Sequence, residues 1–106
     1  MARKNLIVHF NLKPGQSVEA YEKWAREVDL PTVRALPSVD SFRVFRSNGL
    51  FGAEGTPPYQ YGELIEIADD EQFFQDISNE AMQAIAAQFQ TFADIVFVDV
   101  TELEAI

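Results

Sequence analysis

The stretch Asn5-Leu6-Ile7-Val8-His9-Phe10-Asn11-Leu12 decides how this sequence folds. Apolar and polar residues alternate along it with a period of two, which is the pattern of a β-strand whose side chains point to opposite faces. One face is apolar and holds Leu6, Val8, Phe10 and Leu12. The other face carries Asn5, Ile7, His9 and Asn11, including the only histidine of the chain. We expect this second face to line a polar cavity, with His9 as a candidate catalytic residue; the alternative is a structural histidine held by hydrogen bonds.

The segments that follow predict the order β-α-β-β-α-β. Apolar residues recur at helical spacing over residues 18–28, and Pro31 should kink this helix near Glu27 because proline lacks a backbone N–H. Strands are expected over residues 38–46, 59–68 and 94–100, with a broken helix before the last strand. This order is typical of the α+β ferredoxin-like fold, a four-stranded antiparallel sheet with helices on one face.

Residues 47–58 form the only long irregular segment that the sequence predicts. It contains three glycines and two prolines, together with the apolar residues Leu50 and Phe51. Loops of this length in a small domain are often functional or disordered. A lid, an arm that contacts a second subunit and a simple hairpin connection are all compatible with this composition.

The composition limits the classes of protein to which the chain can belong. Residues 1–106 fit a single domain, and the 47% of hydrophobic residues are sufficient for a packed core. The net charge of −9 disfavours nucleic acid as a partner, because phosphate backbones are anionic. All eight Lys and Arg lie in residues 3–46, so the second half of the chain is strongly acidic. No apolar run is long enough for a membrane span or a signal peptide, and we expect a cytoplasmic protein.

The lack of cysteine and the single histidine also limit the chemistry. Thiol nucleophiles, disulfides and zinc–thiolate sites are excluded, and one chain cannot supply a multi-histidine metal site. We therefore expect neither a metal nor a cofactor. His9 could serve as an axial ligand of a haem, although no other residue supports that interpretation.

Several polar and aromatic residues are candidates for a site around His9. In this topology the first strand lies between the third and the fourth, so Glu63 and Tyr61 can be cross-strand neighbours of His9, with Glu63 orienting the imidazole. The other register would place Glu63 against the helices, where an unpaired charge is costly, so we favour the cavity. Asp29 is a further catalytic candidate that can turn inward before Pro31; the alternative is a solvent-exposed acid at a helix break. The candidates for substrate binding are Asn11, Trp24, Tyr61 and Arg43, although the face of Arg43 is left open.

The second face of the sheet also predicts a partner. Three of the expected strands carry large apolar residues on both faces, and the helices can cover only one of them. An exposed apolar face of this size is normally covered by another molecule. We expect a homodimer whose two sheets enclose a space into which His9 points.

The segment from Val28 to Val39, with Asp29-Leu30-Pro31 and Leu36-Pro37-Ser38, resembles the helix-to-strand passage of the dimeric α/β-barrel superfamily. Its EthD-like members have a histidine near the position of Asp29, so the role of that histidine is not carried over to this chain. The whole sequence resembles the RedY-like family of the HapK type, which is encoded with the biosynthetic genes of prodiginine-type tripyrrole pigments. The resemblance implies an accessory protein that acts on or holds a reactive pyrrole or indole intermediate.

Three functions follow from these observations. The first is a cofactor-independent acid–base catalyst in which His9 moves a proton and Asp29 or Glu63 orients it. The second is a non-catalytic protein that binds a small aromatic intermediate in the same cavity. The third is a cofactor-independent monooxygenase, a class that occurs among relatives of this superfamily, although no residue of the chain requires oxygen chemistry.

Overall fold

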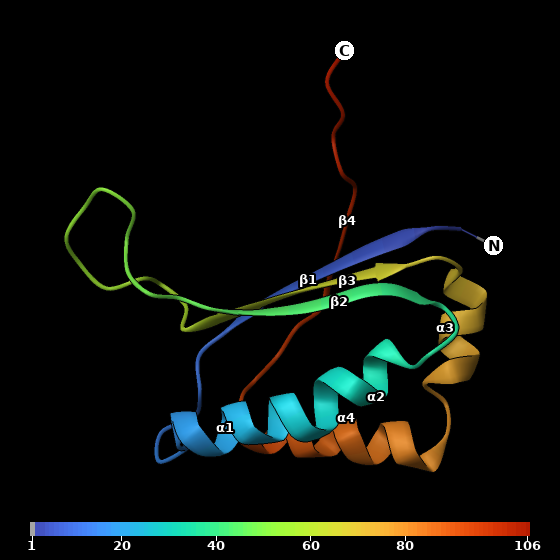
Figure 1. Ribbon diagram of the computed structural model, residues 1–106, viewed down its shortest axis with the longest axis horizontal. Helices are drawn as coiled ribbons and strands as arrows, with labels where there is room; N and C mark the ends of the chain where they lie inside the picture. The colour runs from blue at the N-terminus through green and yellow to red at the C-terminus, as the bar shows by residue number, and fades with distance from the viewer. Residues whose placement is uncertain (1) are drawn as a thin grey trace.

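The computed structural model describes residues 2–106, and its sheet has the predicted topology (Figure 1). Strands β1 (Lys4–Phe10), β2 (Val39–Arg46), β3 (Tyr61–Ile67) and β4 (Val98–Val100) form an antiparallel sheet in the order β2-β3-β1-β4. The alternating stretch around His9 therefore supplies an inner strand between β3 and β4. The ferredoxin-like α+β fold is confirmed.

All helices of the described chain lie on one side of this sheet (Figure 1). They are α1 (Val18–Trp24), η1 (Ala25–Asp29), α2 (Leu30–Arg34), α3 (Asp70–Asp76) and α4 (Glu80–Phe92). The residue immediately before each of the helices α1, α3 and α4 is polar. Its side chain caps the N-terminus of the helix by accepting hydrogen bonds from backbone N–H groups. These caps are Ser17, Asp69 and Asn79. Among residues 2–106, none of these helices is both long and apolar enough to cross a membrane.

The helix before Pro31 is irregular around Glu27, where the kink is predicted. The irregularity is the π-helix η1, in which the N–H of Leu30 donates to the carbonyl of Ala25, and the chain continues as α2. Proline cannot donate to the carbonyl four residues before it, and a π turn shifts the bonding pattern by one residue, so the chain passes Pro31 while remaining helical. Short π-helices of this kind are frequent at functional sites.

The core consists of two clusters between the helices and the sheet. One cluster is aromatic and contains Val8, Phe10, Tyr21, Ala25, Tyr61, Phe89 and Ala93. The other is mainly aliphatic and contains Val33, Phe42, Ile65, Ile67 and Met82. We call the side of the sheet that these clusters cover the helix face.

The opposite side, which we call the open face, has no helix over it (Figure 1). Its residues include His9, Arg43, Phe45, Gly62 and Leu64, since His9 pairs with Gly62, Phe45 pairs with Gly62, and Arg43 pairs with Leu64. Directly paired residues of neighbouring strands point to the same face. The face of Arg43, which the sequence left open, is thereby settled.

The pairing of β1 with β3 corrects the predicted neighbours of His9. Val8 pairs with Glu63 and Phe10 with Tyr61, so Glu63 and Tyr61 lie on the helix face. Alternate residues of a strand point to the same face, so a change of register moves all of them to the other face together. Only the observed register buries Tyr61, Ile65 and Ile67 against the helices. The apolar area that these three side chains remove from water outweighs the cost of one buried carboxyl, which burial keeps protonated.

Candidate functional site

An apolar cavity of about 480 Å³ lies between the helices and the sheet. Its walls come from β1, β3 and the helices α2, α3 and α4, and from the chain that leads to β4. Most of its side chains are apolar, for example Leu6, Val33, Ile65, Met82 and Phe89. Its volume falls in the usual range of small-molecule sites, about 300–1,000 Å³.

Asp29 is a buried carboxylate in the wall of this cavity. It is the last residue of η1, and only 4% of its surface is exposed. Within residues 2–106 its Oδ2 has no hydrogen-bond partner. Burial raises the pKa of Asp29 from 3.8 to about 7, because a charged carboxylate is disfavoured in apolar surroundings. The expectation that Asp29 turns inward is confirmed.

Glu63 is a second buried carboxylate near Asp29. It projects from β3 towards the helices and is 3% exposed, and its Oε2 also lacks a partner in the described chain. Burial, and then repulsion by Asp29, raise the pKa of Glu63 from 4.5 to about 8. We call Asp29 and Glu63 the carboxyl pair.

Tyr21 adds a buried hydroxyl beside the carboxyl pair. Its side chain is fully buried, and its hydroxyl makes no well-formed hydrogen bond within residues 2–106, where Glu63 acts on it only as a weak acceptor. Burial and the nearby charge of Glu63 raise its pKa, so this group remains protonated. Buried polar atoms are nearly always hydrogen-bonded, so three unpartnered ones in one region require an explanation. A carboxyl pair with raised pKa values can hold a proton near neutral pH and both donate and accept one.

His9 lies on the open face and is separated from the carboxyl pair by the sheet. Its ring stacks on Tyr59, with centroids 5.3 Å apart and an interplanar angle of 28°. Gly62 makes room for the imidazole, since a Cβ at that position would lie 3.3 Å from His9 Nδ1. The predicted constellation of His9, Glu63 and Tyr61 therefore does not form within one chain.

Arg43 and Asn11 make contacts with their own chain outside the apolar cavity. The Arg43 guanidinium lies 5.7 Å from the ring centroid of Phe45 and 3.7 Å from a carboxylate oxygen of Glu66. Asn11 donates to the carbonyl of Pro58 and accepts from the N–H of Gln60. Asn11 thus holds the end of the long loop.

Trp24 is the last residue of α1, and its side chain packs against α4. It donates from Nε1 to Gln88 Oε1 at 2.6 Å, and its ring packs against those of Phe89 and Phe92. Substrate binding by Trp24 stays a prediction, as it does for Arg43, Asn11 and Tyr61.

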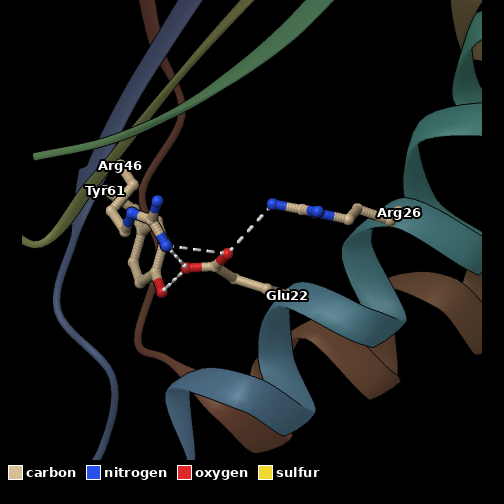
Figure 2. A network of polar contacts seen from close by, with 4 residues as sticks. All are labelled: Glu22, Arg26, Arg46 and Tyr61. Carbon is tan, nitrogen blue, oxygen red and sulfur yellow. Dashed lines mark hydrogen bonds and ion pairs between the residues drawn. The ribbon is translucent and has the colours of Figure 1, made fainter.

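A polar network that the sequence did not predict surrounds Glu22 on α1 (Figure 2). The Tyr61 hydroxyl donates to Glu22 Oε2 at 2.8 Å, and Arg46 Nη1 donates to both carboxylate oxygens at 3.1 and 3.2 Å. Arg26 Nη2 lies 3.3 Å from Glu22 Oε1. Burial and the bond to Glu22 raise the pKa of Tyr61 to about 12. Only the i,i+4 spacing of Glu22 and Arg26 could have indicated part of this network.

Metal ligands do not gather in the part of the chain that the structure describes. Residues 2–106 contain no group of three or more histidine, cysteine, aspartate or glutamate side chains placed to hold a metal ion. The buried polar group of the cavity wall is Asp29, while Lys4, Asp70, Gln83 and Asp99 also line the cavity. Glu63 and the Tyr21 hydroxyl lie behind Asp29, outside the cavity wall, and the three groups together can hold and move protons.

Comparison with known proteins gives a family match over nearly the whole chain. The family model described as REDY-like protein HapK matches residues 4–103. The crystal structure of HapK from Hahella chejuensis is 27% identical in sequence, with a TM-score of 0.72, and the match covers 95% of this chain and 94% of that chain. No curated protein sequence matches.

More distant solved structures share the fold alone. An EthD family protein from Bacillus halodurans is 16% identical, with a TM-score of 0.68 and coverage of 94% of this chain and 99% of that chain. SnoaB, a cofactor-independent oxygenase from Streptomyces nogalater, is 12% identical, with a TM-score of 0.73 and coverage of 100% and 98%. At these identities the likeness extends to the arrangement of helices and strands and no further.

Proposed function

This chain belongs to the REDY-like protein HapK family, and on that premise we propose that it is an accessory protein of prodiginine-type tripyrrole biosynthesis. It binds a small, flat pyrrole or indole intermediate in the apolar cavity and assists its conversion by acid–base chemistry. The carboxyl pair supplies and removes the protons. In this proposal His9 is not the proton-transfer group.

The observation that carries the proposal is the position of Asp29. Its carboxyl is buried in the wall of a mainly apolar cavity, with an oxygen that no other residue of the described chain binds. A mainly apolar cavity suits an aromatic ligand, and a buried carboxyl in its wall can bond a pyrrole N–H or protonate a carbonyl oxygen. Strongly perturbed carboxyls in a cleft are typical of functional sites.

The two members of the carboxyl pair have different roles in the proposed proton transfer. Asp29 faces the ligand, and Glu63 lies next to it outside the cavity wall. Because the two carboxyls repel each other when both are charged, one of them stays protonated near neutral pH. A protonated Asp29 can donate to the oxygen of an aldehyde, and the resulting carboxylate can remove the ring proton after a pyrrole carbon attacks. A well-placed acid–base group typically contributes 10²–10⁴-fold to a rate.

The open face supports a homodimer in this proposal. Phe45, Tyr59 and Val98 are about half exposed there, and no helix covers them. A second copy packed against this face would bury these side chains together with the stacked rings of His9 and Tyr59. His9 then has a role in the interface. Proton transfer by His9 is the alternative, and the metabolites of a His9→Ala strain test it.

Mass spectrometry of pathway metabolites tests the proposal in a producing strain. Four versions are compared: the intact gene, its deletion, Asp29→Asn and His9→Ala. We expect deletion and Asp29→Asn to accumulate the same intermediate, while His9→Ala resembles the intact strain. The Asn variant keeps the size of the side chain but cannot exchange a proton, so circular dichroism and protein level serve as controls for folding.

The other outcomes point to different functions. If His9→Ala reproduces the deletion and Asp29→Asn does not, His9 is the proton-transfer residue. If neither variant reproduces it, the protein holds its ligand without catalysing a reaction. An unchanged metabolite profile in all four versions contradicts the assignment to pigment biosynthesis.

A further inference from the structure

A second pocket lies at the helix–sheet interface, around the Glu22 network (Figure 2). Its volume is about 330 Å³, and it shares no lining residue with the apolar cavity. Its polar walls are Glu22, Arg26, Arg46, Asn48 and the Tyr61 hydroxyl, and its apolar walls include Leu30 and Val44. We call it the arginine pocket.

The charge of the arginine pocket is opposite to that of the chain. Arg26 comes from η1 and Arg46 from the end of β2, and both guanidinium groups converge on the single carboxylate of Glu22. Two cations and one anion leave a local charge of +1, whereas the whole chain carries −9. A protein of this net charge repels anions in general, so binding of an anion requires a local concentration of cations such as this one.

The two guanidinium groups keep donors available to a ligand. Arg26 bonds Glu22 through Nη2 and Arg46 through Nη1, and the described chain contains no other bond from either group. Each guanidinium has five N–H donors in a planar fork. Their side chains are 72% and 57% exposed, so a molecule from solution can reach the remaining donors.

Glu22 holds the pocket in place. Its side chain is only 17% exposed, and it receives a hydrogen bond from the buried Tyr61 in addition to those from the arginines. Isolated surface ion pairs contribute little and hold no fixed geometry. Here the Glu22 carboxylate is bound to the buried Tyr61, and it orients the guanidinium groups of Arg26 and Arg46 in the wall of the pocket. Groups that are already oriented bind a ligand at a lower entropic cost.

We propose that the arginine pocket binds the carboxylate of a small apolar or aromatic monoacid. The free donors of Arg26 and Arg46 suit the two oxygens of a carboxylate, and Leu30 and Val44 suit an apolar body. The local charge of +1 matches a monoanion better than a dianion such as a phosphate monoester. The inference does not depend on the proposed function, since the two pockets have no lining residue in common.

Titration of the purified protein with benzoate and with benzamide, its uncharged isostere, tests this inference. The Nε–Hε signals of the arginines in NMR spectra report binding and its location. We expect benzoate to shift the signals of Arg26 and Arg46 and to bind at least tenfold more tightly than benzamide. Arg46→Gln should weaken benzoate binding at least tenfold, because it removes the charge and most of the donors.

Arg3→Gln is the matched control, because Arg3 forms an exposed ion pair with Asp40 outside the pocket. It should leave benzoate binding unchanged. Arg26→Gln, at a more exposed position, provides a second test if Arg46→Gln unfolds the protein. Equal affinity for benzoate and benzamide, an equal loss with Arg3→Gln, or no binding at millimolar benzoate would each overturn the inference.

Discussion

The two faces of the sheet differ in the burial and the contacts of their ionisable groups. On the helix face, Asp29 and Glu63 are buried and have raised pKa values, and each has an oxygen without a partner in the described chain. On the open face, His9 stacks on Tyr59, and Arg43 lies near Glu66 and Phe45. On the helix face the carboxyls are buried at a cost in stability. On the open face the polar groups contact one another and are exposed to solvent.

This difference separates a candidate site for chemistry from a candidate site for assembly. A carboxyl that is buried without partners costs stability, and proteins keep such groups mainly where a ligand or a proton uses them. Stacked rings and exposed apolar side chains are what an interface buries. The sequence placed His9, Asp29 and Glu63 in one site, and the register of β1 and β3 distributes them between two faces.

The largest expected effect is on the pH dependence of stability. Both carboxyls bind protons more tightly in the folded chain, so the free energy of unfolding should fall as the pH rises from about 4 through about 8. Glu63→Gln removes one of them and should make the protein more stable at pH 9 by about 2–4 kcal/mol. Denaturant titrations at pH 5 and pH 9 measure both effects.

Glu66→Gln is the control, since Glu66 lies on the same strand with its side chain 37% exposed on the open face. It should leave the pH dependence unchanged. If the wild type is as stable at pH 9 as at pH 5, the carboxyl pair is not buried as described here.

The next effect concerns assembly and tests the open face. Leu64→Asp places a charge in the middle of the sheet surface that a second copy would cover. We expect the dissociation constant of the homodimer to rise at least a hundredfold, about 2.7 kcal/mol, because an unpaired charge would be buried. Analytical ultracentrifugation of the variant and of the wild type measures it. A wild-type protein that is monomeric at micromolar concentration would contradict the assignment of this face.

A smaller effect is expected from Gly62→Ala, which tests the packing under His9. The added Cβ would lie 3.3 Å from His9 Nδ1, so the exposed imidazole must shift by a few tenths of an ångström. We expect the stability to change by less than about 1 kcal/mol, because Ala also favours the extended chain over Gly. The NMR signals of His9 and Tyr59 should move, and those of Tyr21 on the helix face should not.

The smallest effect is expected from His9→Ala. Within one chain the ring pair of His9 and Tyr59 is solvent-exposed, and an aromatic pair contributes about 0.5–1.5 kcal/mol even when it is buried, as it would be in the homodimer. Thermal unfolding of the variant should therefore show a loss of less than about 1 kcal/mol. A loss above about 3 kcal/mol would show that His9 is part of the core of the assembled protein, and the contrast between the faces would then be weaker.

Much of the fold was predictable, and the errors have identifiable causes. Alternation along residues 5–12 gave the inner strand, and the sequence around Pro31 indicated that Asp29 turns inward. Alternation shows which residues share a face, but not which face meets the helices, and this is why Glu63 was placed beside His9. Strand β4 is shorter than predicted because Ile95 and Phe97 line the cavity and do not pair with β1.

The Glu22 network lay beyond prediction for a different reason. Arg46 and Tyr61 are 24 and 39 residues away from Glu22, and only the folded sheet brings them to α1. Patterns within one helix or strand carry no information on such contacts. The resemblance to the RedY-like family is confirmed, but its proposed pathway and ligand still depend on the metabolite experiment.

Carbon-13 NMR titration of the carboxyl groups tests the central claim most directly. We expect the carboxyl pair to titrate between about pH 6 and pH 9, and Asp29→Asn to lower the apparent pKa of Glu63 because it removes a repelling charge. The ring signals of His9 should be insensitive to that substitution, since the sheet separates the two faces. Titration of both carboxyls below about pH 5 would contradict the claim that the carboxyl pair retains a proton near neutral pH and can transfer it to a ligand.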